Sequence, residues 1–338
     1  MSSTLDWLLD SDPAIRWQAL GDLMDASPDV VAAERARVTH EGWGARLLSM
    51  QGEDGQWEGG ALFPGGREYF ATQAATDNGD QPWTATEPTL TLLMLFGVDP
   101  AEAAVHRAVE RVAVSSKWEH DLEPFFEGET EPCINGKLVS LGAYYGQNVD
   151  PVVERLLGEQ LADGGWNCEA ENGSIRSSFD TTINVLEGLL AHERAGHGSA
   201  ESIAARRRGE EFLLERRMFR RKSNGEVVRP EYLQLSFPNY WHYDVLRGLD
   251  HFRAAGNPPD ARAAEAIELV RSKRQADGRW LLENTHPGRT HFDLEEGVGR
   301  PSRWMTLRAL RVLDWAVDSR EPARHPGASD VGSREPAT

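Results

Sequence analysis

The sequence Gln160-Leu-Ala-Asp-Gly-Gly-Trp166 joins the end of one amphipathic segment to a turn. The same arrangement occurs at Gln51–Trp57 and, one residue shorter, at Gln275–Trp280. In each copy a Gln is followed by Asp-Gly and then by Trp. The Gly can adopt the positive φ that ends a helix, and the Asp can bond to the backbone of its own turn. Three copies roughly 110 residues apart indicate an internal repeat of helical units.

The pattern Gln-x-x-Asp-Gly-x-Trp resembles the repeat motif of the squalene and terpene cyclases and of the protein prenyltransferase β subunits. The resemblance covers about residues 40–316, and a helix is predicted on either side of each copy. It implies an all-α fold, an α/α toroid in which inner and outer rings of helices surround a central cavity. Because one fold hosts many reactions, the motif by itself does not indicate which reaction takes place.

Apolar and charged helical segments alternate along the chain. The apolar segments, predicted to form the inner ring, begin near residues 87, 132, 180, 240 and 302. With a further pair near the N-terminus, the pattern predicts about six helix pairs in one domain, residues 1–318. The Gly-rich stretch 58–82 is expected to cross the mouth of the ring. Residues 319–338 lack apolar periodicity and are expected to be disordered.

The amino-acid composition disfavours several kinds of partner and location. The 338 residues carry a formal charge of −18, which disfavours nucleic acids and anionic membranes as partners. No apolar run approaches the roughly 20 residues of a membrane span, and no signal peptide is recognisable at the N-terminus. With only two cysteines a disulfide framework is not indicated. The sequence therefore predicts a cytoplasmic protein without integral membrane contact.

Ionisable side chains near the predicted starts of the inner helices are the candidates for catalysis: Glu87, Asp180, His242, Asp244 and Arg303. Glu87 or Asp180 could be a general acid, or could simply favour a helix N-terminus. His242 could transfer protons, or could be an ordinary core or surface histidine. Arg303 could bind an anionic group, or could pair with one of the two acids across the cavity.

The cyclases that begin by protonating an olefin resemble one another in an Asp-x-Asp-Asp motif, which this sequence lacks. The nearest acidic cluster, Asp293-Leu294-Glu295-Glu296, has a different spacing. Aromatic side chains can shelter a cationic intermediate or form ordinary core. Those expected near the starts of inner helices, as substrate-binding candidates, are Trp83, Phe179, Tyr240 and Trp304.

Two cysteines, an acid and a histidine form a candidate zinc set: Cys133, Cys168, Asp180 and His291. Thiolate, carboxylate and imidazole are the usual zinc ligands. The toroid resemblance adds that prenyltransferase β subunits bind zinc with Asp, Cys and His, and lanthionine cyclases with two Cys and one His. The alternative is that both cysteines are small buried hydrophobic residues and that Asp180 caps its helix.

These features favour a terpene-cyclase-like or prenyltransferase-like enzyme. Its site would lie in the central cavity, its substrate would be a small, isoprenoid-like molecule, and zinc is the cofactor considered. The alternative is a binding module that holds a small or lipid-like ligand without turnover, which the missing Asp-x-Asp-Asp motif favours. A scaffold is the third class, because helical repeats often serve as one.

Overall fold

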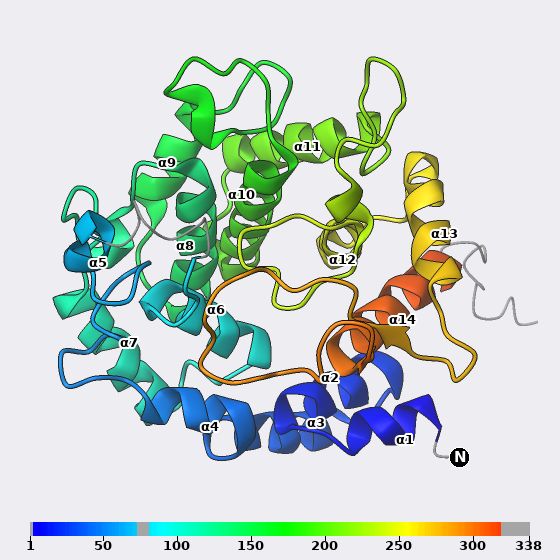
Figure 1. The fold of residues 1–338 in the computed structure, drawn as a ribbon, viewed down its shortest axis with the longest axis horizontal. Helices are drawn as coiled ribbons and strands as arrows, with labels where there is room; N and C mark the ends of the chain where they lie inside the picture. Colours follow the sequence, from blue (N-terminus) through cyan, green and yellow to red (C-terminus); the bar gives the residue numbers. More distant parts are fainter. Residues whose placement is uncertain (1–2, 73–80, 319–338) are drawn as a thin grey trace, which may run out of the picture.

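The computed structural model describes residues 3–72 and 81–318, and its regular secondary structure is almost entirely helical, as predicted. The predicted disordered tail, 319–338, lies outside the described residues. Six helices each contact the next and close into a ring, and they surround the centre of the molecule (Figure 1). They are α2 (Pro13–Leu23), α6 (Thr86–Phe96), α8 (Pro132–Tyr145), α10 (Phe179–His192), α12 (Val245–Ala255) and α14 (Arg303–Asp318).

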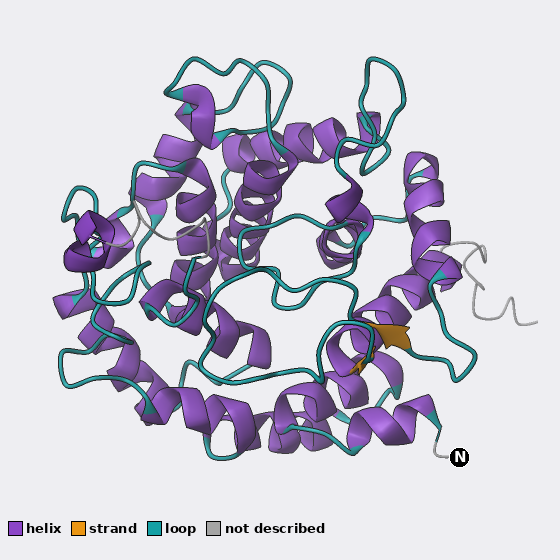
Figure 2. Cartoon of the chain, viewed as in Figure 1, coloured by secondary structure: helices purple, strands orange, loops and turns teal. Residues whose placement is uncertain are grey.

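A second set of helices lies outside this ring (Figure 1). It comprises α3 (Pro28–Ala36), α4 (Gly42–Ser49), α7 (Ala103–Ser115), α9 (Asp150–Gly158), α11 (Ala200–Glu215) and α13 (Ala264–Ser272). The described structure also contains two short helices, α1 (Thr4–Leu9) and α5 (Arg67–Thr72), a small antiparallel pair, β1 (Trp280–Leu281) and β2 (Pro301–Ser302), and several single-turn helical segments (Figure 2). The inner helices are buried on most sides because they pack between the outer helices and the centre.

The repeated motif is the device that joins an outer helix to the next inner helix. In each copy the Gly after Asp has a positive φ, between 83° and 96°. The Trp that follows is fully buried; its indole N–H donates to a carbonyl in the last turns of the preceding outer helix, and its backbone N–H donates to a Thr hydroxyl of the next inner helix. The three sets are Trp57 with Leu47 and Thr86, Trp166 with Leu156 and Thr182, and Trp280 with Val270 and Thr306.

The Gln of the motif connects neighbouring outer helices. The side-chain amide of Gln51 donates to the Ala108 carbonyl of α7, and that of Gln160 donates to the Ala205 carbonyl of α11. In the shortened third copy the Gln275 amide bonds locally, to Lys273. In its two full-length copies the motif therefore bonds an outer helix both to the next inner helix and to the next outer helix.

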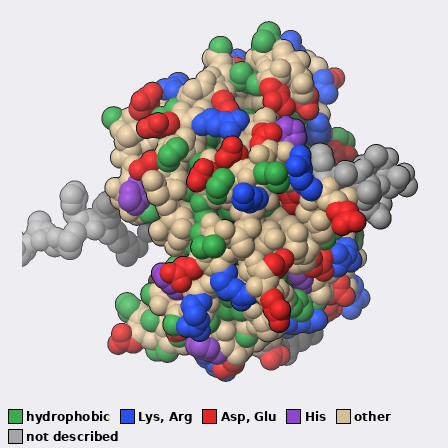
Figure 3. Space-filling view, turned by 90° about the vertical axis from the view of Figure 1, so that its left-hand side faces the viewer, with side chains coloured by type: hydrophobic (Ala, Val, Ile, Leu, Met, Phe, Trp, Pro, Cys, Tyr) green, Lys and Arg blue, Asp and Glu red, His purple; other side chains and the backbone are tan. Residues whose placement is uncertain are grey.

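The connections before α12 and α14 cross the centre of the ring (Figure 1). The two segments are joined where the Glu283 and Asn284 backbone N–H groups both donate to the Leu235 carbonyl. The predicted crossing by 58–82 falls partly on residues 73–80, outside the described residues, while its described part carries α5 at the periphery. On that side of the molecule acidic and basic side chains are interspersed (Figure 3).

Within the described ranges, no helix combines the length and the apolar character that a membrane span requires.

Candidate functional site

A cavity of about 270 Å³ lies at the centre of the ring. All six inner helices contribute side chains to its wall, together with residues 237–240 of the connection before α12. This volume is at the small end of ligand pockets, which usually measure about 300–1,000 Å³. The fold therefore builds a compact site for a small molecule, and we call it the central cavity.

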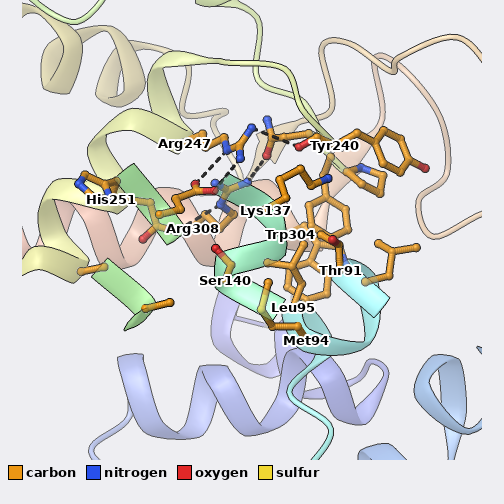
Figure 4. Close-up of a pocket in the computed structure, with 18 of the residues that line it drawn as sticks. Thr91, Met94, Leu95, Lys137, Ser140, Tyr240, Arg247, His251, Trp304 and Arg308 are labelled. Carbon is orange, nitrogen blue, oxygen red and sulfur yellow. Dashed lines mark hydrogen bonds and ion pairs between the residues drawn. The ribbon is translucent and has the colours of Figure 1, made fainter. Parts of the chain in front are cut away.

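The wall of the central cavity is divided into an apolar and a charged part. Figure 4 shows Trp304, Met94 and Leu95 gathered at one end, and Arg247, Arg308 and His251 at the other. Trp304 is held by stacking on Phe237, with the ring centroids 4.3 Å apart. Such a division matches an amphipathic ligand, with its apolar body against Trp304.

The carboxylates of the central cavity are fully engaged. Both oxygens of Glu187 accept from Arg247, at 2.9 and 2.6 Å. Both oxygens of Asp250 accept from Arg311, and Arg253 and Arg308 add further contacts. Burial by itself would raise the pKa of each carboxyl, but the guanidinium groups outweigh it and lower the pKa. Both acids are therefore ionised and are poor proton donors.

Several donors of the same wall, by contrast, have capacity to spare. Trp304 Nε1 and His251 Nδ1 are buried and have no hydrogen-bond partner among the described residues. Lys137 Nζ has one partner, Glu87 Oε1 at 2.9 Å, and no described residue accepts from Arg308 Nη2. Buried polar groups normally find partners. A wall with saturated acceptors and unsaturated donors favours a ligand that brings its own acceptors, such as a carboxylate or a phosphate.

A second, smaller cavity of about 130 Å³ lies against the connection 282–297. It shares Leu92, Phe237, Pro238 and Tyr240 with the central cavity, so these residues form a common wall. Tyr240 also stacks on Trp83, with the centroids 4.0 Å apart and the planes 8° from parallel. The second cavity therefore offers aromatic faces directly beside the central cavity.

Glu295 is the carboxyl of the second cavity that is suited to proton transfer. Its Oε1 accepts from Ser302 Oγ at 2.5 Å and from the Trp304 backbone N–H at 3.2 Å, and the Arg303 backbone N–H adds a further hydrogen bond to the carboxyl. Burial raises its pKa to about 7, against the opposing effect of those hydrogen bonds. A general acid works best when its pKa lies near the working pH. Glu295 belongs to the acidic cluster whose spacing differs from Asp-x-Asp-Asp.

Replacing Glu295 with Gln is expected to stabilise the protein at alkaline pH. The folded pKa of about 7 exceeds the value of 4.5 that is usual for a free glutamate, so stability contributed by this group is lost as pH rises from 4.5 to 7. Above pH 7 the loss amounts to roughly 3 kcal/mol. Urea unfolding of Glu295→Gln should therefore show a higher free energy of unfolding than wild type at pH 8 and little difference at pH 4. The exposed neighbour in Glu296→Gln is the control, and an equal gain there would contradict the assignment.

In the structure, Glu87 and Asp180 form ion pairs and hydrogen bonds that hold neighbouring parts of the fold together. Glu87 is 3 % exposed, pairs with Lys137 and accepts from the Thr91 hydroxyl. Asp180 accepts from the Tyr232 hydroxyl at 2.7 Å and from the Tyr243 backbone N–H at 2.8 Å. Neither acid lines the central cavity.

Asp244 and Arg303 also serve the fold. Asp244 is the N-cap of α12, so this helix begins at Val245 and not at Tyr240 as predicted, because Asp244 accepts the Arg247 backbone N–H. Arg303 pairs with neither Glu87 nor Asp180. Its guanidinium donates to the Trp7 and Asp10 carbonyls at α1, and so it joins the last inner helix to the N-terminus.

The His242 ring stacks on the rings of Trp241 and His286, with ring centroids 3.6 and 3.5 Å apart. Burial, with a further contribution from His286, lowers its pKa to about 3, so the ring is neutral at physiological pH. His242 is thus a neutral, stacked residue beside the site.

His291 Nε2 shares a hydrogen bond of 2.8 Å with the Thr89 hydroxyl, and His291 lines the second cavity.

The four aromatic candidates separate into two groups. Tyr240 and Trp304 line the central cavity, and Trp83 lines the second cavity with Tyr240. Phe179, the first residue of α10, instead packs against the rings of Phe212, Tyr232 and Tyr243.

Cys133 and Cys168, 35 residues apart in the chain (168 − 133), meet in space. Together with Glu131 they place two sulfurs and a carboxylate oxygen within 4.8 Å of one another. The hydrogen bond with Cys168 and burial raise the pKa of the Cys133 thiol. Asp180 and His291 do not belong to this group. The donor set nonetheless fits a thiophilic cation such as zinc.

The reasoning from helix starts missed the charged residues deeper in the inner helices: Lys137, Glu187, Arg247, Asp250, Arg308 and Arg311. A signal for them exists in the sequence. Each is a charged residue within an otherwise apolar segment that is predicted to form an inner helix. Burial of a charge in such a helix is unfavourable unless the charge is paired.

Comparison with known proteins gives only distant similarities. No protein-family model and no curated protein matches the chain. A crystal structure of a protein from Actinoplanes matches with 18 % identity and a TM-score of 0.44, covering 93 % of this chain and 97 % of that one. The type II terpene cyclase MstE from Scytonema matches in a complex with geranylgeranyl dihydroxybenzoate, its substrate, with 15 % identity and a TM-score of 0.42, covering 91 % and 87 %. An apo form of MstE matches with a TM-score of 0.35, 15 % identity and coverages of 85 % and 97 %. The chain is thus distantly similar to a terpene cyclase in structure, at a level that identifies neither a family nor an activity.

Proposed function

We propose that this α/α toroid is a terpene-cyclase-like or prenyltransferase-like enzyme whose central cavity binds an amphipathic, isoprenoid-like molecule with an anionic group. The observation that carries the proposal is the mismatch in the cavity wall, where the carboxylates are saturated and the donors are not. An anionic group would accept hydrogen bonds at Arg308 and Lys137, and the apolar body would lie against Trp304.

Proton transfer in this proposal belongs to Glu295. It lines the second cavity and has a pKa near 7, whereas Glu187 and Asp250 are held ionised by arginines. A ligand body that reaches past Tyr240 would enter the second cavity, where Trp83 and Tyr240 present aromatic faces. Such faces stabilise positive charge that develops on a ligand.

A non-catalytic binding module is the second candidate, and one observation favours it. Within the central cavity itself every described carboxylate is paired with arginine, so the ligand pocket contains no proton donor of this kind. In that case the ligand would be held by the same donors and released unchanged.

Titration calorimetry with matched ligands tests the binding step. An isoprenoid carboxylate or diphosphate is expected to bind at least tenfold more tightly than the alcohol of the same chain length, since hydrogen bonds to charged groups contribute about 1.5–3 kcal/mol. Arg308→Met should remove most of this preference and still fold, because Asp250 keeps Arg311 and Arg253. The control is Arg271→Met, a cation removed from the exposed face of α13. Equal affinity for acid and alcohol in wild type would contradict the proposal.

Mass spectrometry of the incubated ligand separates the two candidates. Loss of product formation in Glu295→Gln, with ligand affinity retained, is expected of the enzyme. Recovery of unchanged ligand from wild type across all anionic ligands that bind would favour the binding module.

A further inference from the structure

We infer that Glu131, Cys133 and Cys168 form a binding site for a thiophilic divalent cation, zinc in particular. Cys133 lies at the second position of α8, directly after Glu131-Pro132, and Cys168 lies in the turn that follows the second Gln-Asp-Gly-Trp motif. None of the three residues lines the central cavity, so this site does not depend on the ligand proposed there.

The spacing of the three ligand atoms fits one ion. The two sulfurs and the Glu131 oxygen lie within 4.8 Å of one another, and Cys133 Sγ is 3.5 Å from Glu131 Oε2. Zinc binds thiolate sulfur at about 2.3 Å in a tetrahedral arrangement, so two sulfurs on one ion lie about 3.8 Å apart. The observed limit of 4.8 Å is thus within about 1 Å of the separation that one zinc ion requires.

The charge balance of the site points to a cation. Two thiols and a carboxylate converge, and among the described residues no lysine, arginine or histidine forms an ion pair with Glu131. A divalent cation would compensate the negative charge.

The surroundings hold Cys168 in place. The Thr181 hydroxyl of α10 donates to Cys168 Sγ at 3.5 Å, and the Cys168 backbone N–H donates to the same hydroxyl at 3.4 Å. Partners of this kind orient metal ligands and hold them for binding. The site therefore spans three parts of the ring: the start of α8, the turn after the motif, and the first turn of α10.

Three protein ligands leave a fourth tetrahedral position open. Structural zinc sites usually have four protein ligands, whereas zinc sites with three keep a position for water or an incoming ligand. Glu131 is exposed, so the open position is accessible from solvent. We therefore assign a site whose fourth ligand can exchange and could be water or a small thiol. It is not a structural zinc site with four protein ligands.

Cobalt binding to the reduced full-length chain tests this assignment. One equivalent of Co²⁺ is expected to bind and to give a thiolate-to-metal charge-transfer band in the near ultraviolet, and Zn²⁺ should displace it. Cys133→Ser and Cys168→Ser should each abolish the band while circular dichroism confirms that they remain folded. Glu131→Gln should keep the band and weaken affinity at least tenfold, because one ligand of the set is lost. Glu127→Gln, an exposed acid nearby, is the matched control and should bind as wild type does.

Three outcomes would overturn the assignment. The first is a reduced chain that binds no cobalt, with both thiols free by titration. The second is a reduced chain that binds none but whose two thiols are joined when oxidised glutathione is added, which would make the pair a dithiol–disulfide couple. The third is loss of binding in Asp180→Asn with full retention in Glu131→Gln, which would give the third ligand position to Asp180.

Discussion

Trp166→Ala is expected to lower the free energy of unfolding by about 4 kcal/mol, as large-to-small substitutions of buried aromatic residues do. Trp166 is fully buried, and its indole N–H donates to the Leu156 carbonyl of α9 at 2.7 Å. The substitution opens a cavity between the outer and inner rings and also leaves that carbonyl without its partner. Urea unfolding followed by far-ultraviolet circular dichroism measures the loss.

Two further variants divide this loss into its causes. Trp166→Phe keeps much of the apolar contact and removes the N–H group, so an intermediate loss is expected. Trp241→Ala is the control, because Trp241 is 37 % exposed and should cost less than about 1 kcal/mol. A loss at Trp241 as large as at Trp166 would show that the motif tryptophans have no special role in joining the rings.

Lys137→Met is expected to cost about 3–5 kcal/mol, because it leaves Glu87 buried without its counter-ion. The side chains of Lys137 and Glu87 are only 7 % and 3 % exposed, and they join α8 to α6 at 2.9 Å. The double variant Glu87→Gln with Lys137→Met removes both charges, and it should be markedly more stable than the single variant. Thermal and urea unfolding of the two proteins provide the comparison.

The partly exposed ion pair Lys273–Glu283 supplies the control for this effect. It has a similar distance, 2.7 Å, but its side chains are 20 % and 29 % exposed. Lys273→Met should therefore change stability by at most about 1 kcal/mol. If the double variant at Glu87 and Lys137 were as unstable as the single one, loss of packing and not the unpaired charge would be the cause.

The starts of most inner helices follow from local chemistry, and the sequence predicted four of the five to within one residue. The starts expected near 87, 132, 180 and 302 lie at Thr86, Pro132, Phe179 and Arg303. The start of α12 was wrong by five residues (245 − 240). There the chain after Phe237-Pro238 is held irregular by bonds to Asp244, which accepts from Ser236 and Asn239.

The candidate site was predicted less well than the fold. The predicted candidates lay at the first residues of each inner helix, and those residues mostly cap helices or bond to connections, as Asp180 and Asp244 do. Other side chains that form the central cavity, such as Glu187 and Arg308, lie one or more turns further along. Their partners come from other helices, so no single stretch of sequence identifies them.

The sequence alone determined the helical class, the repeat and the turns, because these depend on neighbours within a few residues. The positive φ of Gly164 and the buried Trp166 are consequences of a local motif. Only the tertiary structure decided which charges are paired and which donors remain unsatisfied around the cavity. It also decided that Cys133 and Cys168 meet. Such contacts join distant segments, and their geometry is fixed only when the six inner helices close into a ring.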